Sequence, residues 1–187
     1  MMKFIKAHRF LLSCLTIIFL SSFIASIVQS SFTKVEIDLK ELRTDDGQTL
    51  VYDLYKPKIA KQDNKVPFVV VVPGFQRSKE ALSNIAIELS RRGMVVALID
   101  PYAQGMSSSS TSRIAATTQG YGMFALVDYA HDGNFPFVDI SKIASTGHSM
   151  GGNAAIRGAD FFGKEAINEK RKSCLLYTSP SPRDVSS

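Results

Sequence analysis

Residues 142–152 read KIASTGHSMGG, and this stretch decides the fold that we expect for the chain of 187 residues. Lys142 to Gly147 predicts a short buried strand, and a helix is expected from Gly151 onward. The residues between them match the pattern G-x-S-x-G around Ser149. A strand that passes into a helix through this pattern is typical of a nucleophile elbow, a sharp turn that exposes the serine hydroxyl.

The elbow explains why glycines flank the serine. The residues two before and two after Ser149 come close together in such a turn, so only small side chains fit, here Gly147 and Gly151. The turn holds the hydroxyl at a helix N-terminus, where the dipole and free N–H groups favour negative charge. The pattern alone is only moderately specific, and a glycine-rich turn with a structural serine is the alternative.

Two further apolar runs upstream predict buried strands of a parallel sheet, at residues 68–72 and 94–99. Between them, Ser78 is expected to cap a helix that ends at Gly93. That helix has apolar side chains at helical spacing, at Leu82, Ile85, Ala86 and Leu89.

The remaining elements complete an α/β pattern. Residues 32–39 and 49–55 predict an antiparallel hairpin, and Thr44 to Gly47 its turn. A serine-rich loop is expected at residues 105–112, followed by a helix that ends near Asp132-Gly133 and carries Met123, Leu126, Val127 and Ala130. We therefore predict a mostly parallel α/β sheet with an N-terminal antiparallel hairpin.

An acyl-transfer site needs N–H groups aimed at the oxyanion that forms. In a G-x-S-x-G architecture one donor is the residue after the nucleophile, here Met150. The other comes from the loop after the strand at residues 68–72, which makes Phe75 the second candidate. Pro73-Gly74-Phe75 also reads as an ordinary turn.

These segments resemble the α/β-hydrolases, most closely bacterial dienelactone-hydrolase-like serine esterases. The resemblance covers most of residues 66–160, and the Gly-His-Ser-Met-Gly-Gly elbow is its most specific part. It implies that Ser149 attacks a small carboxylic ester and forms an acyl-enzyme, with neither metal nor organic cofactor. Cutinase-like polyesterases, prolyl-oligopeptidase-type peptidases and a non-catalytic binding domain stay open as alternatives.

This chain departs from the family order of Ser, then Asp or Glu, then His. Acidic residues follow Ser149 at Asp160, Glu165 and Glu169, but no histidine does. His148 sits inside the elbow, and His131 is expected to end a helix. The triad acid and histidine are therefore expected outside this chain, and the chain itself is expected to be inactive. The resemblance assigns Asp100 to bracing a loop.

Both ends are expected to lie outside the fold. Residues 1–30 predict an export signal or membrane anchor, with a positive flank before the uncharged run at residues 10–28. If it is retained, this run inserts in the membrane and leaves the domain at residues 31–173 outside the cytoplasm. Residues 174–187 resemble a translated sequencing adapter, and the C-terminal part of the fold is therefore expected to be missing.

The charge distribution and the cysteine content argue against nucleic-acid-binding, disulfide-stabilised and cysteine-metal proteins. The net charge is +5, but Lys3, Lys6 and Arg9 supply three of these charges, so the rest of the chain carries only +2. A nucleic-acid interface needs clustered basic residues, and the sequence therefore predicts none. Cys14 and Cys174 leave the domain between them without a thiol, so neither a disulfide framework nor a cysteine metal site is expected.

Overall fold

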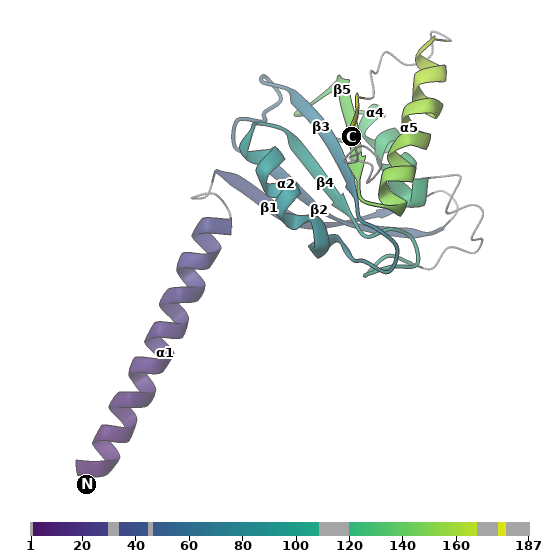
Figure 1. Cartoon of the computed structure of the whole chain (residues 1–187). Helices are drawn as coiled ribbons and strands as arrows, with labels where there is room; N and C mark the ends of the chain where they lie inside the picture. The colour runs from purple at the N-terminus through teal and green to yellow at the C-terminus, as the bar shows by residue number, and fades with distance from the viewer. Residues whose placement is uncertain (1, 30–33, 45–46, 109–119, 168–175, 179–187) are drawn as a thin grey trace, which may run out of the picture. The chain divides into compact units, whose positions relative to one another are not determined.

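The chain forms two units, Met1–Lys34 and Val35–Ser187. Figure 1 shows the first as a helix and the second as a sheet with helices packed on it. The computed structural model describes residues 2–29, 34–44, 47–108, 120–167 and 176–178.

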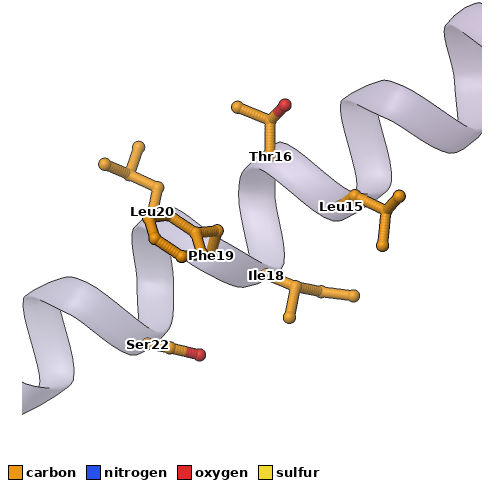
Figure 2. Close-up of a pocket in the computed structure, with 6 residues that line it drawn as sticks. All are labelled: Leu15, Thr16, Ile18, Phe19, Leu20 and Ser22. Atoms are coloured by element: carbon orange, nitrogen blue, oxygen red, sulfur yellow. The ribbon is translucent and has the colours of Figure 1, made fainter.

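The first unit contains the helix α1, Met2–Gln29. From His8 to Val28 its mean hydropathy is 2.4, and at about 1.5 Å per residue this stretch matches the ~30 Å hydrocarbon core of a bilayer. The helix therefore has the length and composition that the expected export signal or anchor requires. Most of its large apolar side chains between Phe10 and Val28 are exposed, and they point in several directions, as Figure 2 shows for Leu15, Ile18, Phe19 and Leu20.

The second unit is built on one six-stranded sheet with the order β1-β2-β4-β3-β5-β6. The strands β1, Val35–Arg43, and β2, Thr49–Pro57, form the predicted antiparallel hairpin. The hairpin is confirmed, although residues 32 and 33 of its expected first strand lie outside the described residues. β2 also pairs antiparallel with β4, Val95–Ile99, and so joins the hairpin to the parallel part of the sheet.

The parallel part is centred on β3, Val66–Val72, which lies between β4 and β5, Val138–Gly147. Every residue of β4 is buried, and so is every residue of β3 except Pro67. A strand covered on both faces has no polar side for water, which is why these strands read as continuous apolar runs. The predicted fold class, a mostly parallel α/β sheet with an N-terminal hairpin, is confirmed.

Helices cover both faces of the sheet. The helix α2, Ser83–Arg91, packs on the face that carries Val69 and Val71. A short 3-10 turn, η2, Gly120–Gly122, precedes α4, Met123–His131. α4 and α5, Met150–Ile167, pack on the opposite face, which carries Val70 and Val72.

A helical segment begins after Ser78 as predicted, but the expected capping by the Ser78 side chain is wrong. Ser78 precedes a 3-10 helix, η1, Lys79–Leu82, and its side chain makes no capping hydrogen bond. The first N–H group of η1, that of Lys79, donates to Asp100 Oδ1 at 2.7 Å, so a carboxylate at the end of β4 contacts the start of this helix. Ile85, expected on the buried face, is 41% exposed, whereas the helix end at Gly93 with φ of 91° is confirmed.

The C-terminal strands differ in extent from the sequence prediction. β5 begins four residues before Lys142, because Val138 pairs with Val66 beyond a register shift. A short sixth strand, β6, Leu176–Thr178, runs parallel to residues 144–146 of β5. It falls within the expected adapter tail, whose origin stays a prediction. Residues 109–112 of the serine-rich loop and Glu169 lie outside the described residues.

Candidate active site

The connection between β5 and α5 consists of only two residues, His148 and Ser149. Ser149 has φ of 54°, in the left-handed region that L-residues other than glycine rarely adopt, at a cost of about 1–3 kcal/mol. Hydrogen bonds from the Gly151 N–H to the His148 carbonyl (2.9 Å) and from the Asn153 N–H to the Ser149 carbonyl (3.1 Å) hold the turn. The Ser149 residue is exposed at its apex.

The two glycines of the motif lie where no side chain fits. A Cβ on Gly147 would lie 2.5 Å from both the Val72 carbonyl oxygen and the Gly151 carbonyl carbon. A Cβ on Gly151 would collide with the Val72 carbonyl group and lie 2.7 Å from the Pro73 oxygen. The elbow is thus packed backbone to backbone against the end of β3, which is the steric reason for glycine at both positions.

The same packing brings the loop after β3 beside the serine. The His148 N–H donates to the Val72 carbonyl at 3.2 Å. A Cβ on Gly74 would lie 3.1 Å from His148 Nδ1 and 3.4 Å from the Ser149 Cβ. Residues 74–77 form a tight turn closed by a hydrogen bond from the Arg77 N–H to the Gly74 carbonyl at 3.2 Å. We call these four residues the Gly74–Arg77 turn.

The two candidate oxyanion donors share one property. Within the part of the chain that the structure describes, neither the Phe75 N–H nor the Met150 N–H donates a hydrogen bond. Phe75 lies on the Gly74–Arg77 turn with a side chain 58% exposed, and Met150 is the first residue of α5. The first N–H groups of a helix have no internal acceptor, so the start of α5 is suited to hold a negatively charged oxygen.

The histidines of the chain all precede the nucleophile candidate in sequence. His148 adjoins Ser149, with its Nδ1 against Gly74, and His131 is the last residue of α4, as predicted. The Ser149 hydroxyl forms no hydrogen bond with any residue, histidine or other, in the part of the chain that the structure describes. Asp160 lies on α5, two to three turns beyond the elbow.

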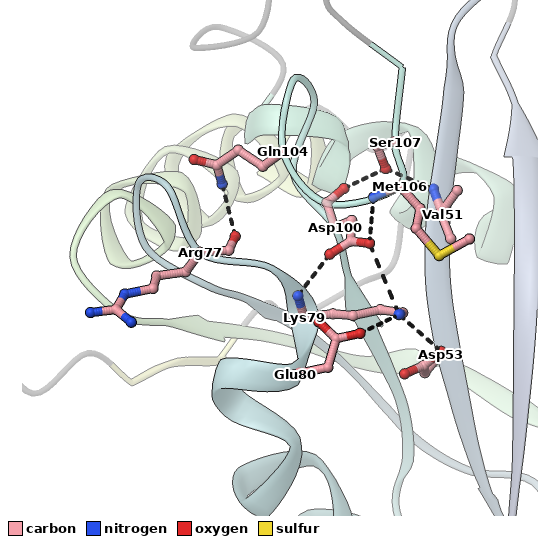
Figure 3. A network of polar contacts seen from close by, with 9 residues as sticks. All are labelled: Val51, Asp53, Arg77, Lys79, Glu80, Asp100, Gln104, Met106 and Ser107. Atoms are coloured by element: carbon pink, nitrogen blue, oxygen red, sulfur yellow. Dashed lines mark hydrogen bonds and ion pairs between the residues drawn. The ribbon is translucent and has the colours of Figure 1, made fainter.

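Asp100 has the bracing contacts that the resemblance assigned to it (Figure 3). It is fully buried at the end of β4, and its carboxylate accepts from the N–H groups of Lys79 (2.7 Å) and Met106 (2.9 Å). Its own carbonyl accepts from the Ser107 hydroxyl at 2.7 Å. One side chain therefore ties the segment after the Gly74–Arg77 turn to the loop at residues 101–108.

A buried lysine completes this brace, and the sequence analysis did not identify it. The Lys79 side chain is 6% exposed, with its Nζ 2.8 Å from Glu80, 3.7 Å from Asp53 and 4.0 Å from Asp100. Burial alone would lower the pKa of Lys79, but the hydrogen bond to Glu80 and the neighbouring carboxylates raise it overall.

The pKa values of two acidic partners of Lys79 are shifted in opposite directions. Burial raises the pKa of Asp53 above its ordinary value, although the Lys79 charge opposes this. The hydrogen bond from Lys79 lowers the pKa of Glu80 to about 2. Lys79 and Glu80 are therefore both charged at neutral pH.

A second residue missed by the sequence analysis is Gln104, whose side-chain amide contacts the Gly74–Arg77 turn. It donates to the Gly74 carbonyl at 3.2 Å and to the Arg77 carbonyl at 3.1 Å, and it accepts from the Gln76 N–H. No local pattern marks such a residue, because its partners lie about thirty positions away in the chain.

Comparison with known proteins finds similarity at the level of structure. No family model and no curated protein matches the chain. GrgF, an α/β hydrolase from Penicillium sp. sh18, is 28% identical with a TM-score of 0.58, and the match covers 67% of this chain and 42% of GrgF.

Two esterases also match in structure. An esterase from Pyrococcus furiosus is 22% identical with a TM-score of 0.56, covering 70% of this chain and 49% of the esterase. Est1E from Butyrivibrio proteoclasticus, solved with ferulic acid bound, is 24% identical with a TM-score of 0.55, covering 66% and 48%. The chain thus spans less than half the length of each of these three proteins.

Proposed function

The chain has the α/β-hydrolase fold, and on that premise we propose that it is part of a serine hydrolase that cleaves carboxylic esters. The observation that carries the proposal is the juxtaposition at the end of β3. There an exposed serine with φ of 54° lies against a turn, and two nearby N–H groups donate no hydrogen bond among the described residues.

The proposed chemistry begins with attack of Ser149 Oγ on the ester carbonyl carbon, while the hydroxyl proton passes to a base. The carbonyl electrons move to oxygen, and the Phe75 and Met150 N–H groups hydrogen-bond the resulting oxyanion; each such donor is worth about 3–4 kcal/mol. Collapse of this intermediate breaks the C–O bond, and the alcohol leaves with a proton. Water then cleaves the acyl-enzyme to the carboxylic acid and restores the serine.

The base in this scheme is a histidine that follows Ser149 in the complete protein, oriented by an acidic residue. The three histidines of the 187-residue chain, His8, His131 and His148, all precede Ser149. We therefore expect negligible turnover from the 187-residue chain alone. A hydroxyl without a base is a poor nucleophile, and removal of triad members leaves only residual catalysis.

The proposed location is outside the cytoplasm. The uncharged run at residues 10–28 of α1 follows a positively charged flank, Lys3, Lys6 and Arg9, an arrangement typical of export signals and of anchors with a cytoplasmic N-terminus. We propose no metal or organic cofactor for the reaction.

The test is reaction of a fluorophosphonate with the protein expressed from its complete gene. The Ser149 Oγ–P bond forms and the P–F bond breaks, fluoride leaves, and the hydroxyl proton passes to the base. We expect mass spectrometry to locate the modification on Ser149 and to find none in Ser149→Ala. Ser141→Ala, which removes an exposed serine of β5, is the matched control and should be modified at Ser149 like the wild type.

A protein left unmodified at Ser149 would favour the second candidate, a hydrolase-like binding domain, which the histidine content of this chain motivates. If Ser149 is modified, the substrate that the protein hydrolyses identifies the type of bond that it cleaves. Hydrolysis of a short-chain aryl ester supports the proposal, whereas cleavage of only a prolyl peptide amide, or of only a polyester film, selects the peptidase or the cutinase-like alternative.

A further inference from the structure

The Gly74–Arg77 turn has little of its own to fix it. One backbone hydrogen bond closes it, and its Gln76 has φ of 55°, an uncommon left-handed conformation for a residue with a side chain. The Phe75 side chain is exposed and so provides no buried anchor. A donor for an oxyanion needs a fixed direction, so the restraint has to come from elsewhere in the molecule.

The Gln104 amide supplies three contacts to this one turn. Its oxygen accepts from the Gln76 N–H, and its nitrogen donates to the carbonyls of Gly74 and Arg77. The contacts bracket Phe75, because they fall on the residues before and after it (Figure 3 shows the contact to Arg77). Only one orientation of the amide fits, since rotation by 180° would set oxygen against two carbonyls and nitrogen against an N–H group.

Gln104 is itself held by its loop. Its N–H donates to the Pro101 carbonyl at 2.9 Å, and its carbonyl accepts from the Ser107 N–H at 3.2 Å. The next residue, Gly105, has φ of 55° and leaves no room for a Cβ beside the Asp100 carboxylate. The platform that carries the amide is therefore tied to the buried Asp100 at the end of β4.

We propose that Gln104 is a positioning residue that orients the Phe75 N–H toward the oxyanion, acting through the turn and not on the substrate. The inference rests on the proposed function, because it assigns Phe75 its role as a donor. Loss of a whole donor typically lowers the rate about 10²- to 10³-fold. A donor that is present but points in the wrong direction retains part of its stabilising effect. We therefore expect loss of the Gln104 contacts to lower the rate about 10- to 100-fold.

The first test compares Gln104→Met with the wild type in the protein expressed from its complete gene. Methionine keeps the length of the side chain and removes all three hydrogen bonds. We expect the rate of fluorophosphonate reaction at Ser149 and kcat for a short-chain aryl ester to fall about 10- to 100-fold, with KM changed less than about threefold.

Asn64→Ala is the matched control for this test. The Asn64 amide also donates to a loop carbonyl, that of Ile59 at 2.8 Å, but it precedes β3, roughly 20 Å along the strand from its Ser149 end. It should react and turn over like the wild type. A folded Gln104→Met variant with unchanged kcat and reaction rate, beside a reactive wild type, would refute the positioning role alone. An unreactive wild type would instead overturn the proposed function.

A second variant keeps the inference testable if methionine disturbs folding. Gln104→Glu retains an acceptor for the Gln76 N–H, but an ionised carboxylate faces the Gly74 and Arg77 carbonyls without a proton to donate. Protonation returns one donor, so kcat relative to the wild type should recover as the pH falls toward the pKa of the introduced carboxyl. A ratio that stays constant with pH contradicts the proposal, because loss of bulk packing has no such dependence.

Discussion

The elbow at residues 147–151 and the Gly74–Arg77 turn lie against each other, but they are held by different means. The elbow is fixed by backbone packing, since Gly147 and Gly151 leave no space between β5, α5 and the end of β3. The turn is fixed by the Gln104 amide from a distant loop, and the segment that follows the turn is held by the Asp100 carboxylate. A steric constraint between residues close in sequence requires particular residues at fixed spacing and is therefore visible as a motif. A polar contact between residues far apart in sequence produces no such motif.

The largest effect is expected where the elbow is tightest. Gly151→Ala places a Cβ against the Val72 carbonyl group, and because backbone atoms line the site, no side chain can turn away to relieve the clash. We expect the free energy of unfolding to fall by more than about 3 kcal/mol, at or beyond the upper end of overpacking costs. Equilibrium urea unfolding of the protein measures it.

Gly163→Ala is the matched control on the same helix, because a Cβ there meets nothing within 4 Å. Alanine is a better helix former than glycine, so this variant should gain up to about 1 kcal/mol. If the two variants lose stability equally, backbone packing is not what distinguishes the elbow.

The next effect concerns the remote support of the turn. Asp100→Asn replaces one carboxylate oxygen by an NH₂ group that faces a backbone N–H donor and removes the negative charge beside Lys79. We expect a loss of about 2–3 kcal/mol in urea unfolding, the cost of a buried polar group left without its partner. Asp38→Asn on the exposed part of β1 should change stability by less than about 0.5 kcal/mol.

The smallest effect comes from the exposed edge of the same network. Glu80 is 66% exposed, and its pKa is lowered to about 2 by the hydrogen bond from Lys79, so this bond stabilises the fold only while Glu80 is ionised. Glu80→Gln should cost less than about 1 kcal/mol at pH 6, because an exposed ion pair is screened by solvent.

The pH dependence of that difference follows from the direction of the shift. Stability from a lowered pKa is complete above the ordinary value near 4.5 and is lost as the pH falls toward 2. The gap between wild type and Glu80→Gln should therefore close over that range in unfolding experiments at successive pH values. A gap that persists at pH 2 would mean that Glu80 acts through packing and not through its charge.

The sequence predicted the strands well where burial is complete. Val70 and Val72 face one side of the sheet, and Val69 and Val71 face the other. Both faces are covered, so a continuous apolar run at residues 68–72 correctly predicts a buried strand. Side-chain periodicity does not encode the neighbours of a strand, and the position of β4 between β2 and β3 was accordingly not predicted.

The candidate site was predictable only in part for a similar reason. Ser149, Gly147 and Gly151 lie within five residues, so sterics alone relate them. Ser78 was expected to cap a helix because capping is local, and it does precede one, but its side chain makes no capping hydrogen bond. The contact of the Lys79 N–H with the carboxylate of Asp100, over twenty residues away, was not predicted. Gln104 was missed on the same ground, since its three partners lie in a turn that precedes it by about thirty residues.

Gly151 packs so closely against the Val72 carbonyl that no Cβ would fit between them. The turn that carries Ser149 is therefore in direct contact with β3, a central strand of the sheet. Because backbone atoms line this contact and no flexible side chain separates them, we expect a displacement of β3 by a few tenths of an ångström to be passed on to Ser149. A cavity-forming substitution in the core such as Val70→Ala is therefore expected to shift the position of the Ser149 hydroxyl as well as to lower stability.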